Sequence, residues 1–141
     1  MTIQEVQNQI IEEFEIFEDW MDKYEYIIEL GNNLEPYDDK DKTPSNLIQG
    51  CQSRVWLNAE MKNAKIIFSA DSDAIITKGI IAILIRVANN RTPEEVMNLD
   101  FNFIEKIGLR ENLSPTRANG LVSMIKNMKA YGMAFHAKNN V

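Results

Sequence analysis

The residue of this sequence best suited to covalent chemistry is its single cysteine, Cys51. It follows Gly50, which gives the backbone conformational freedom, and it precedes Gln52, Ser53 and Arg54. A thiol in polar surroundings beside a cation is expected to be accessible and to have a stabilised thiolate, which is the form that reacts. The pattern therefore favours a reactive cysteine over the alternative, a small buried hydrophobic residue.

Other kinds of site find little support in the sequence. The only histidine, His136, lies near the C-terminal end, and no good base stands close to Cys51, so a cysteine hydrolase is disfavoured. Asp38, Asp39 and Asp41 lack the glycine and the distal glutamate of a calcium loop, and we interpret them as solvated charge. The sequence shows no glycine-rich phosphate loop. We expect no bound metal and no resident cofactor.

The cysteine stretch also carries a family resemblance. Residues 49–56, Gln-Gly-Cys-Gln-Ser-Arg-Val-Trp, resemble the cysteine loop of the SufE family, the sulfur-acceptor proteins of iron–sulfur cluster assembly. The resemblance continues through Asp-Ser-Asp at 71–73, Lys-Gly at 78–79 and Leu-Ser-Pro-Thr-Arg-Ala-Asn-Gly-Leu at 113–121. It extends from about Phe14 to the terminal helix, which is nearly the whole chain.

This resemblance implies a function. Cys51 would accept persulfide sulfur from a SufS-type cysteine desulfurase, stimulate that enzyme and pass the sulfur to the SufBCD scaffold. The chain would then be a sulfur carrier and activator with a transient cysteine persulfide, rather than a free-standing enzyme with a bound cofactor. The resemblance also implies that Cys51 rests partly shielded on its loop and moves out at the docked partner.

The resemblance assigns further site residues by position. Asp73 matches a loop-supporting and partner-contacting residue, and Arg117 matches a basic residue linked to function. The predicted loop-supporting or partner-binding residues are Gly50, Gln52, Ser53, Asp73 and Arg117. Arg117 also lies in the first turn of its predicted helix, where the helix dipole disfavours a cation. We therefore expect a specific partner for it, either a carboxylate such as Asp73 or Cys51 itself.

Two alternatives to sulfur transfer stay open. SufE resembles the scaffold protein IscU in fold, but a cluster scaffold normally needs about four ligands, mostly thiolates. The other alternative is a protein-interaction module in which Cys51 is structural. The sequence leaves open the partner affinities, whether the desulfurase is of the SufS type, and whether the chain forms a homodimer.

Size and charge limit the class of protein. The 141 residues predict a single domain, residues 1–141, and the net charge of −6 argues against nucleic acid and anionic membranes as partners. Residues 1–50 hold 13 acidic and 3 basic side chains, a net −10, which indicates either solvated helix faces or an acidic surface that selects a partner. No signal peptide or membrane span is predicted, and one cysteine favours a reducing, cytoplasmic setting.

Hydrophobic spacing predicts several helices. Apolar residues at steps of three and four begin at Ile3, and a second helix begins near Asp19 or Trp20 and ends at 31–33. A third, residues 74–88, is apolar on nearly all sides and should be the buried central helix, with N-cap residues from 71–73. Further helices are predicted from Thr92-Pro93, over 102–109 and from Ser114-Pro115 to the C-terminal region.

Alternating apolar and polar residues predict strands at 54–61 and 65–70, joined by a short turn at 62–64, and a shorter strand at 47–49. The short connection makes the two longer strands antiparallel. The predicted fold class is α+β, with a small three-stranded antiparallel sheet packed against helices in a SufE/IscU-like arrangement. Cys51 would lie where a flexible loop enters the sheet.

Overall fold

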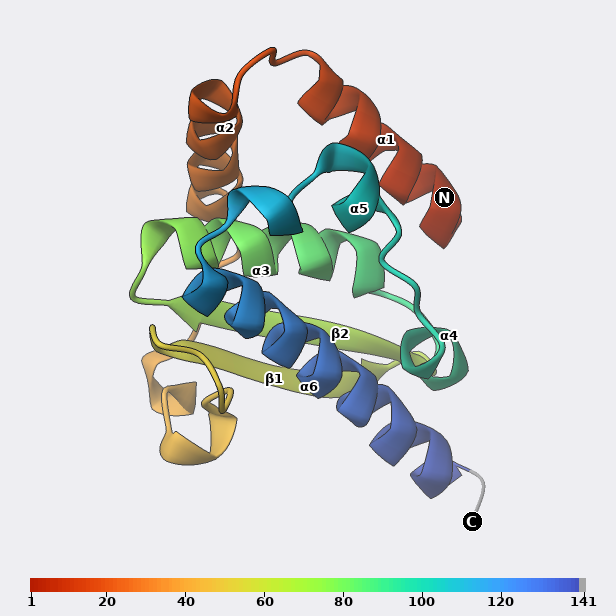
Figure 1. Ribbon diagram of the computed structural model, residues 1–141. Helices are drawn as coiled ribbons and strands as arrows, with labels where there is room; N and C mark the ends of the chain where they lie inside the picture. Colours follow the sequence, from red (N-terminus) through yellow and green to blue (C-terminus); the bar gives the residue numbers. More distant parts are fainter. Residues whose placement is uncertain (140–141) are drawn as a thin grey trace.

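The computed structural model describes residues 1–139 (Figure 1). Its helices are α1 (Ile3–Glu15), α2 (Trp20–Asn32), α3 (Ile75–Ala88), α4 (Pro93–Met97), α5 (Phe103–Ile107) and α6 (Pro115–Asn139). Its strands are β1 (Val55–Lys62) and β2 (Lys65–Ser72), and short 3₁₀ turns lie at 39–41, 44–46 and 110–112. Helices packed on an antiparallel pair confirm the predicted α+β class.

Side-chain caps fix where most of the helices begin. Asp19 accepts the Asp22 N–H at the start of α2, and Thr92 forms a capping box with Glu95 at the start of α4. The predicted cap of α3 is wrong. Its N-cap is Ala74, without a side-chain hydrogen bond. Residues 71 and 72 belong instead to the end of β2, and Asp73 is used by the cysteine loop.

The two strands form a regular hairpin. Every residue of β1 pairs with one of β2, from Val55 opposite Ser72 to Lys62 opposite Lys65. The connecting residues Asn63 and Ala64 have φ of +54° and +66°, the left-handed conformations of a type I′ turn. That turn matches the right-handed twist of the strands and so fixes their register.

The predicted third strand is not found, and the sheet within residues 1–139 has two strands. Leu47 forms a single isolated bridge with Trp56, and the Ile48 N–H donates to the Val55 carbonyl at 2.9 Å. A 3₁₀ turn ends just before this segment, and Gly50 turns the backbone just after it, at φ +89°. Too few extended residues remain between the 3₁₀ turn and Gly50 to pair with β1 over more than one bridge.

Helix α3 is the centre of the core. It lies against β2, with α1 and α2 packed on its other side (Figure 1). Helix α6 runs across the sheet and contacts α3. Ile81, Leu84 and Val87 are fully buried, which confirms the predicted central helix. No helix within residues 1–139 is long and apolar enough to cross a membrane.

The crossing of α2 and α3 depends on two glycines. A Cβ added to Gly79 would lie 2.1 Å from the carbonyl oxygen of Ile27, and one added to Gly31 would lie 2.7 Å from the Gly79 nitrogen. Real Cβ atoms do not approach other atoms so closely, so the backbones meet only because neither residue has a side chain. The close packing of α2 against α3 therefore requires glycine at position 79.

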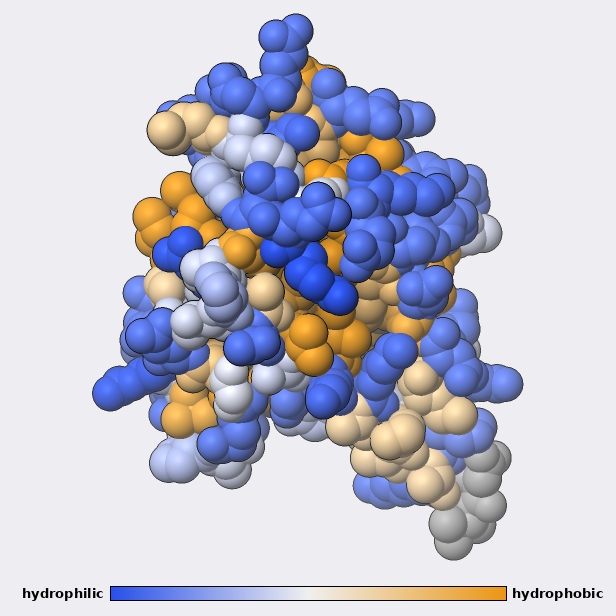
Figure 2. All heavy atoms as spheres, viewed as in Figure 1, coloured by the Kyte–Doolittle hydropathy of each residue, from blue (hydrophilic) through white to orange (hydrophobic). Residues whose placement is uncertain are grey.

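The acidic charge of residues 1–50 lies largely on the outside of α1 and α2. Glu12, Glu15, Glu25 and Glu29 are all exposed. On the face shown in Figure 2, hydrophilic side chains cover most of these helices, while apolar residues show through between neighbouring elements. This surface is available to a partner, and selection of a partner by its charge stays a prediction.

Candidate functional site

The loop that holds Cys51 requires a glycine immediately before it. Gly50 has φ +89°, which residues other than glycine rarely adopt. A Cβ at this position would also lie 2.5 Å from the Oγ of Ser123 on α6. The loop can therefore lie flat against α6 only because residue 50 has no side chain.

Cys51 is half-buried beneath this loop. Its Sγ–H donates to the carbonyl oxygen of Gly120 at 3.7 Å, and a Cβ on Gly120 would lie 3.5 Å from the sulfur. Burial raises the pKa of the thiol above its ordinary value of 9.0, and no charged group within residues 1–139 offsets that rise. The expected stabilisation of the thiolate by Arg54 is thus absent, and the resting sulfur is a protonated thiol at neutral pH.

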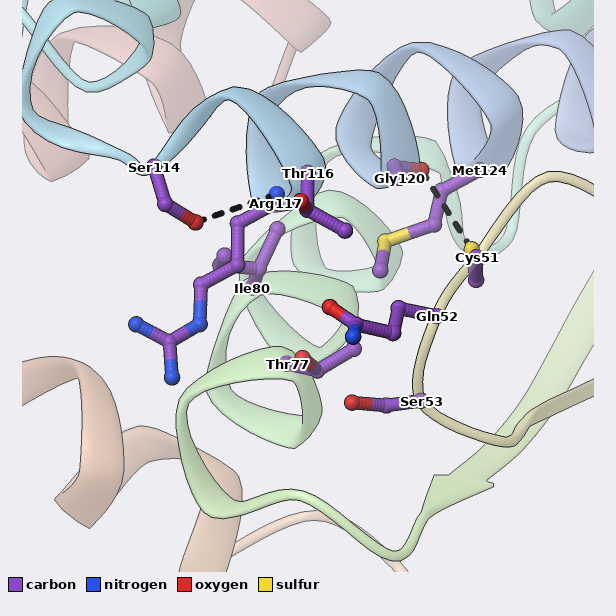
Figure 3. Close-up of a pocket in the computed structure, with 10 residues that line it drawn as sticks. All are labelled: Cys51, Gln52, Ser53, Thr77, Ile80, Ser114, Thr116, Arg117, Gly120 and Met124. Carbon is purple, nitrogen blue, oxygen red and sulfur yellow. Dashed lines mark hydrogen bonds between the residues drawn. The ribbon is translucent and has the colours of Figure 1, made fainter.

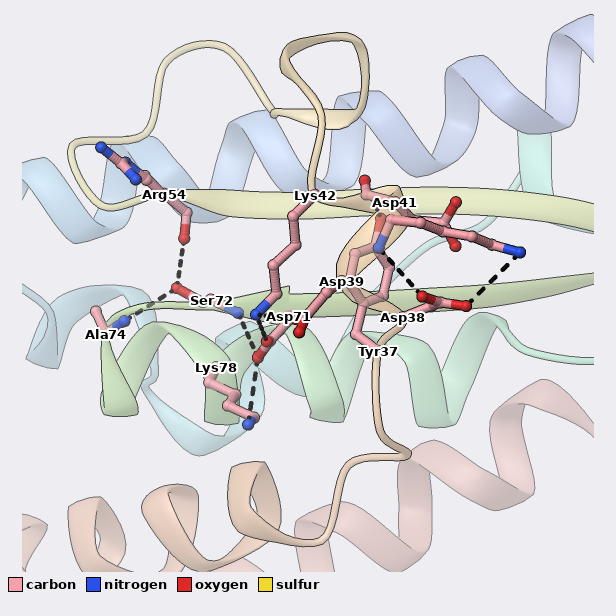
Figure 4. Close-up of polar contacts among 11 residues, drawn as sticks. Tyr37, Asp38, Asp39, Asp41, Lys42, Arg54, Asp71, Ser72, Ala74 and Lys78 are labelled. Carbon is pink, nitrogen blue, oxygen red and sulfur yellow. Dashed lines mark hydrogen bonds and ion pairs between the residues drawn. The ribbon is translucent and has the colours of Figure 1, made fainter.

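Asp73 holds the far end of the cysteine loop. Its Oδ1 accepts the Arg54 N–H at 3.0 Å, and its own N–H donates to the Arg54 carbonyl at 3.3 Å. The Ser72 hydroxyl donates to the same carbonyl at 2.7 Å (Figure 4). Asp73 thus fixes the backbone at Arg54, and the loop-supporting or partner-contacting role assigned to it stays a prediction. Asp73 is exposed, so its carboxylate can also be reached from solvent.

A second cluster of charges surrounds Asp71, which lies in β2 two residues before Asp73 (Figure 4). Its carboxylate lies 3.1 Å from the Lys42 Nζ and 3.2 Å from the Lys78 Nζ. Lys42 also lies 5.4 Å from the centre of the Trp56 ring. Burial opposes ionisation of Asp71, but the N–H of Ser72 and the two lysines outweigh it, and the pKa of the carboxyl falls below 3.8. Asp71 therefore ties the segment before the cysteine loop to β2 and α3.

A cavity of about 230 Å³ lies beside the cysteine (Figure 3). It is enclosed by the cysteine loop, the first half of α3 and the beginning of α6. The lining residues are Cys51, Gln52, Ser53, Thr77, Ile80, Ser114, Thr116, Arg117, Gly120 and Met124. Figure 3 shows Cys51 at one end of the hollow and the Arg117 guanidinium at the other, with Gln52 and Thr77 between them.

Two polar side chains of this cavity, Arg117 and Thr77, lack partners within residues 1–139. Arg117 is exposed and forms no ion pair with any described residue, so the expected pairing with Asp73 or Cys51 is wrong. Thr77 is only 6% exposed, yet within residues 1–139 its hydroxyl has no hydrogen-bond partner. No carboxylate is among the lining residues. The cavity therefore presents donors and one cation without a negative charge to balance them.

Most of the predicted site residues meet at this cavity. Cys51, Gln52, Ser53 and Arg117 line it, and Gly50 shapes the loop above it. Asp73 lies outside the lining, at the other end of the loop. The sequence did not identify the other lining residues, which are Thr77, Ile80, Ser114, Thr116, Gly120 and Met124. Four of these lie at or after the Ser114-Pro115 helix signal, whereas Thr77 and Ile80 lie within an apolar helix and gave no signal as site residues.

The chain matches known proteins along most of its length. A family model described as SufE, Fe-S metabolism associated domain, matches residues 8–132. A SufE-like protein of Rhizobium etli is 41% identical over 127 residues, which cover 86% of each chain. A SufE-like protein of Synechocystis is 38% identical over 126 residues, covering 89% of this chain and 79% of the relative.

A solved structure shares the fold. The solution structure of a hypothetical protein from Thermus thermophilus superposes with a TM-score of 0.72. The match covers 92% of this chain and 94% of that protein, at 20% sequence identity. At this identity the likeness concerns the fold alone.

Proposed function

The chain belongs to the SufE family, and from that membership and the geometry around Cys51 we propose that it carries sulfur on this cysteine. The donor would be a SufS-type cysteine desulfurase and the onward acceptor the SufBCD scaffold. Binding to the desulfurase would also stimulate that enzyme. The chain's single cysteine suits a reducing, cytoplasmic setting.

The observation that carries this proposal is the half-buried thiol on a glycine-hinged loop. A carrier must protect its sulfur between partners, because an exposed persulfide is lost to other thiols and oxidants. It must also present the sulfur to two partners in turn. The contact of the Cys51 sulfur with Gly120 supplies cover, and the left-handed Gly50 supplies a point about which the loop can turn.

The transfer itself balances without an added oxidant. The Cys51 thiolate attacks the outer sulfur of the desulfurase persulfide, and a new bond forms to that sulfur. The bond between the two desulfurase sulfurs breaks, and its electron pair stays on the enzyme's cysteine as a thiolate. The reaction resembles thiol–disulfide exchange, whose rate depends on the fraction of thiolate and on access.

Docking of the desulfurase would have to expose the Cys51 thiol and increase the fraction that is ionised. In the free chain burial keeps the Cys51 pKa high, so little thiolate is present at neutral pH. A partner that binds the loop in an outward position exposes the sulfur to solvent and removes this effect. We therefore expect that alkylation of Cys51 accelerates in a complex with a desulfurase whose own reactive cysteine is replaced.

The direct test is to incubate the protein with a desulfurase and cysteine and then measure the mass of the Cys51-containing peptide. Wild type should gain the mass of a sulfur atom, and Cys51→Ser should fold normally and gain none. A Cys51→Ser protein that unfolds would show that the cysteine is structural. Desulfurase stimulation that survives the substitution would favour an interaction module. Bound iron after reconstitution would favour a cluster scaffold.

A further inference from the structure

The cavity beside Cys51 contains more polar groups than are needed to hold one sulfur atom on the cysteine. The lining provides the Arg117 guanidinium and the hydroxyls of Ser53, Thr77 and Thr116, and it contains no carboxylate. Thr77 is 6% exposed and lines the cavity, and its hydroxyl makes no hydrogen bond within residues 1–139, so it is free to bond to a ligand or to water in the cavity. An anion is the ligand that satisfies such a donor set.

The position of the cation limits what this anion can be. The Cys51 sulfur contacts Gly120, and Arg117 lies three residues earlier on α6, a rise of about 4.5 Å. Figure 3 shows the guanidinium extending further in the direction away from Cys51. A sulfur atom added to Cys51 would lie at the cysteine end of the cavity, and the guanidinium lies at the other end. The ligand therefore has its anionic group several bonds from the end that meets the cysteine.

The size of the cavity is consistent with such a molecule. A cavity of about 150 Å³ accepts benzene, a ring of carbon atoms alone. The cavity beside Cys51 measures about 230 Å³, so it admits a compound of that size or slightly larger. Ile80 and Met124 form an apolar part of the wall, which suits the carbon chain and sulfur of the ligand.

We propose that this cavity binds a low-molecular-mass thiol that carries a carboxylate. The carboxylate would be held by Arg117 with Thr77 and the hydroxyls near the start of α6, and the thiol would face Cys51. Resting on the proposed sulfur-carrier function, the site gives the Cys51 persulfide a small-molecule acceptor besides the protein scaffold. The thiolate of the ligand attacks the outer sulfur, the bond from that sulfur to Cys51 Sγ breaks, and the electron pair remains on Cys51.

Binding is tested first, without any persulfide. The probe is 3-mercaptopropionate, titrated by calorimetry under reducing conditions into the Cys51→Ser protein, and its matched neutral analogue is 3-mercaptopropionamide. The acid should bind and the amide should bind about tenfold more weakly or worse, because a charge-assisted hydrogen bond is lost. Arg117→Met should abolish this preference, and Thr77→Val should reduce it. Lys126→Met removes an exposed cation from the same helix outside the cavity and should change nothing.

Transfer is tested next, with wild-type protein persulfidated by a desulfurase and then separated from it. The acid should remove the sulfur about tenfold faster than the amide, and Arg117→Met should equalise the two rates. Failure of the protein to load sulfur would count against the proposed function. Equal binding of acid and amide, or a preference that survives Arg117→Met, would overturn the small-thiol site and leave the sulfur-carrier function standing.

Discussion

The polar cluster around Asp71 on β2 and the cavity beside Cys51 both contain charged side chains, but these side chains are used differently. Asp71 has two lysine partners and the N–H of Ser72, so its charge is compensated within the fold. The side chains of Arg117 and Thr77 in the cavity have no partner within residues 1–139. The paired groups hold Lys42 and Lys78 against β2, and the unpaired groups are left for a ligand or partner.

This difference predicts opposite responses to substitution. Removing a paired charge should lower stability, because its partners lose their compensation. Removing an unpaired group should leave stability unchanged and alter binding instead. Four measurements can break or sharpen this contrast, from the largest expected change in free energy to the smallest.

Gly50→Ala should have the largest effect. The left-handed conformation costs a residue with a side chain about 1–2 kcal/mol, and the new Cβ collides with the Ser123 hydroxyl. The loop should lift from α6, and alkylation of Cys51 by iodoacetamide should accelerate about tenfold for each 1.4 kcal/mol of this cost. Adding Ser123→Ala removes the collision but not the backbone strain, so it should restore part of the protection. An unchanged alkylation rate in Gly50→Ala would show that the loop is not held closed in this way.

Asp71→Asn should lower the free energy of unfolding by about 1 kcal/mol at pH 7, because two partly exposed ion pairs are lost. The pKa of Asp71 is depressed in the folded state, so its contribution is present above pH 3.8 and is lost as pH falls through the folded pKa. Urea denaturation should therefore separate wild type and variant at pH 7 and bring them together in acid. Asp39→Asn is the control: its carboxylate also pairs with Lys42, at 3.3 Å, but it is 92% exposed, so its loss should change the free energy of unfolding much less.

The titration of Cys51 should change the free energy of unfolding less than that of Asp71, and stability should fall as pH rises instead of as pH falls. Its pKa is raised in the folded state, so its contribution to stability is complete below about pH 9 and is lost as pH rises through the folded value. The alkylation rate of the native protein should rise with pH with a midpoint above 9.0. The midpoint for protein unfolded in urea should be lower. A native midpoint at or below the unfolded one would mean that the thiol is solvated at rest.

Arg117→Met should have the smallest effect on stability, within about 0.5 kcal/mol in urea denaturation, because the side chain is exposed and unpaired. The substitution also removes a cation from a helix N-terminus, where the dipole disfavours it. A loss as large as that of Asp71→Asn would erase the contrast between the two regions. It would indicate that Arg117 has a structural partner in solution.

The sequence predicted those features that depend on neighbouring residues. The starts of α2 near Asp19 and of α4 at Thr92 and the apolar α3 are local signals, and all three are confirmed. The cap of α3 failed because Asp73, which has the right chemistry, binds the Arg54 N–H instead. The third strand failed because turns on both sides leave Leu47 a single bridge.

In the candidate site, too, local motifs were predicted and contacts between distant segments were not. Cys51 and Arg117 were identified as candidates from their motifs, and the structure places both at one cavity. The partner expected for Arg117 was wrong, because a tendency to pair does not indicate which carboxylate is near. Thr77 could not be identified, because its importance arises only when α3, α6 and the cysteine loop enclose one space. Contacts between segments so distant in the chain leave no local pattern.

The close crossing of α2 and α3 at two glycines implies that different parts of the chain open to solvent at very different rates. Because the backbones touch at Gly31 and Gly79, neither helix can slide past the other without breaking the core. Amide hydrogens at this crossing should therefore exchange with solvent only when the fold opens globally. Those of the cysteine loop should exchange through brief local openings. The molecule would thus combine slowly exchanging amides at the helix crossing with rapidly exchanging amides around the proposed reactive sulfur.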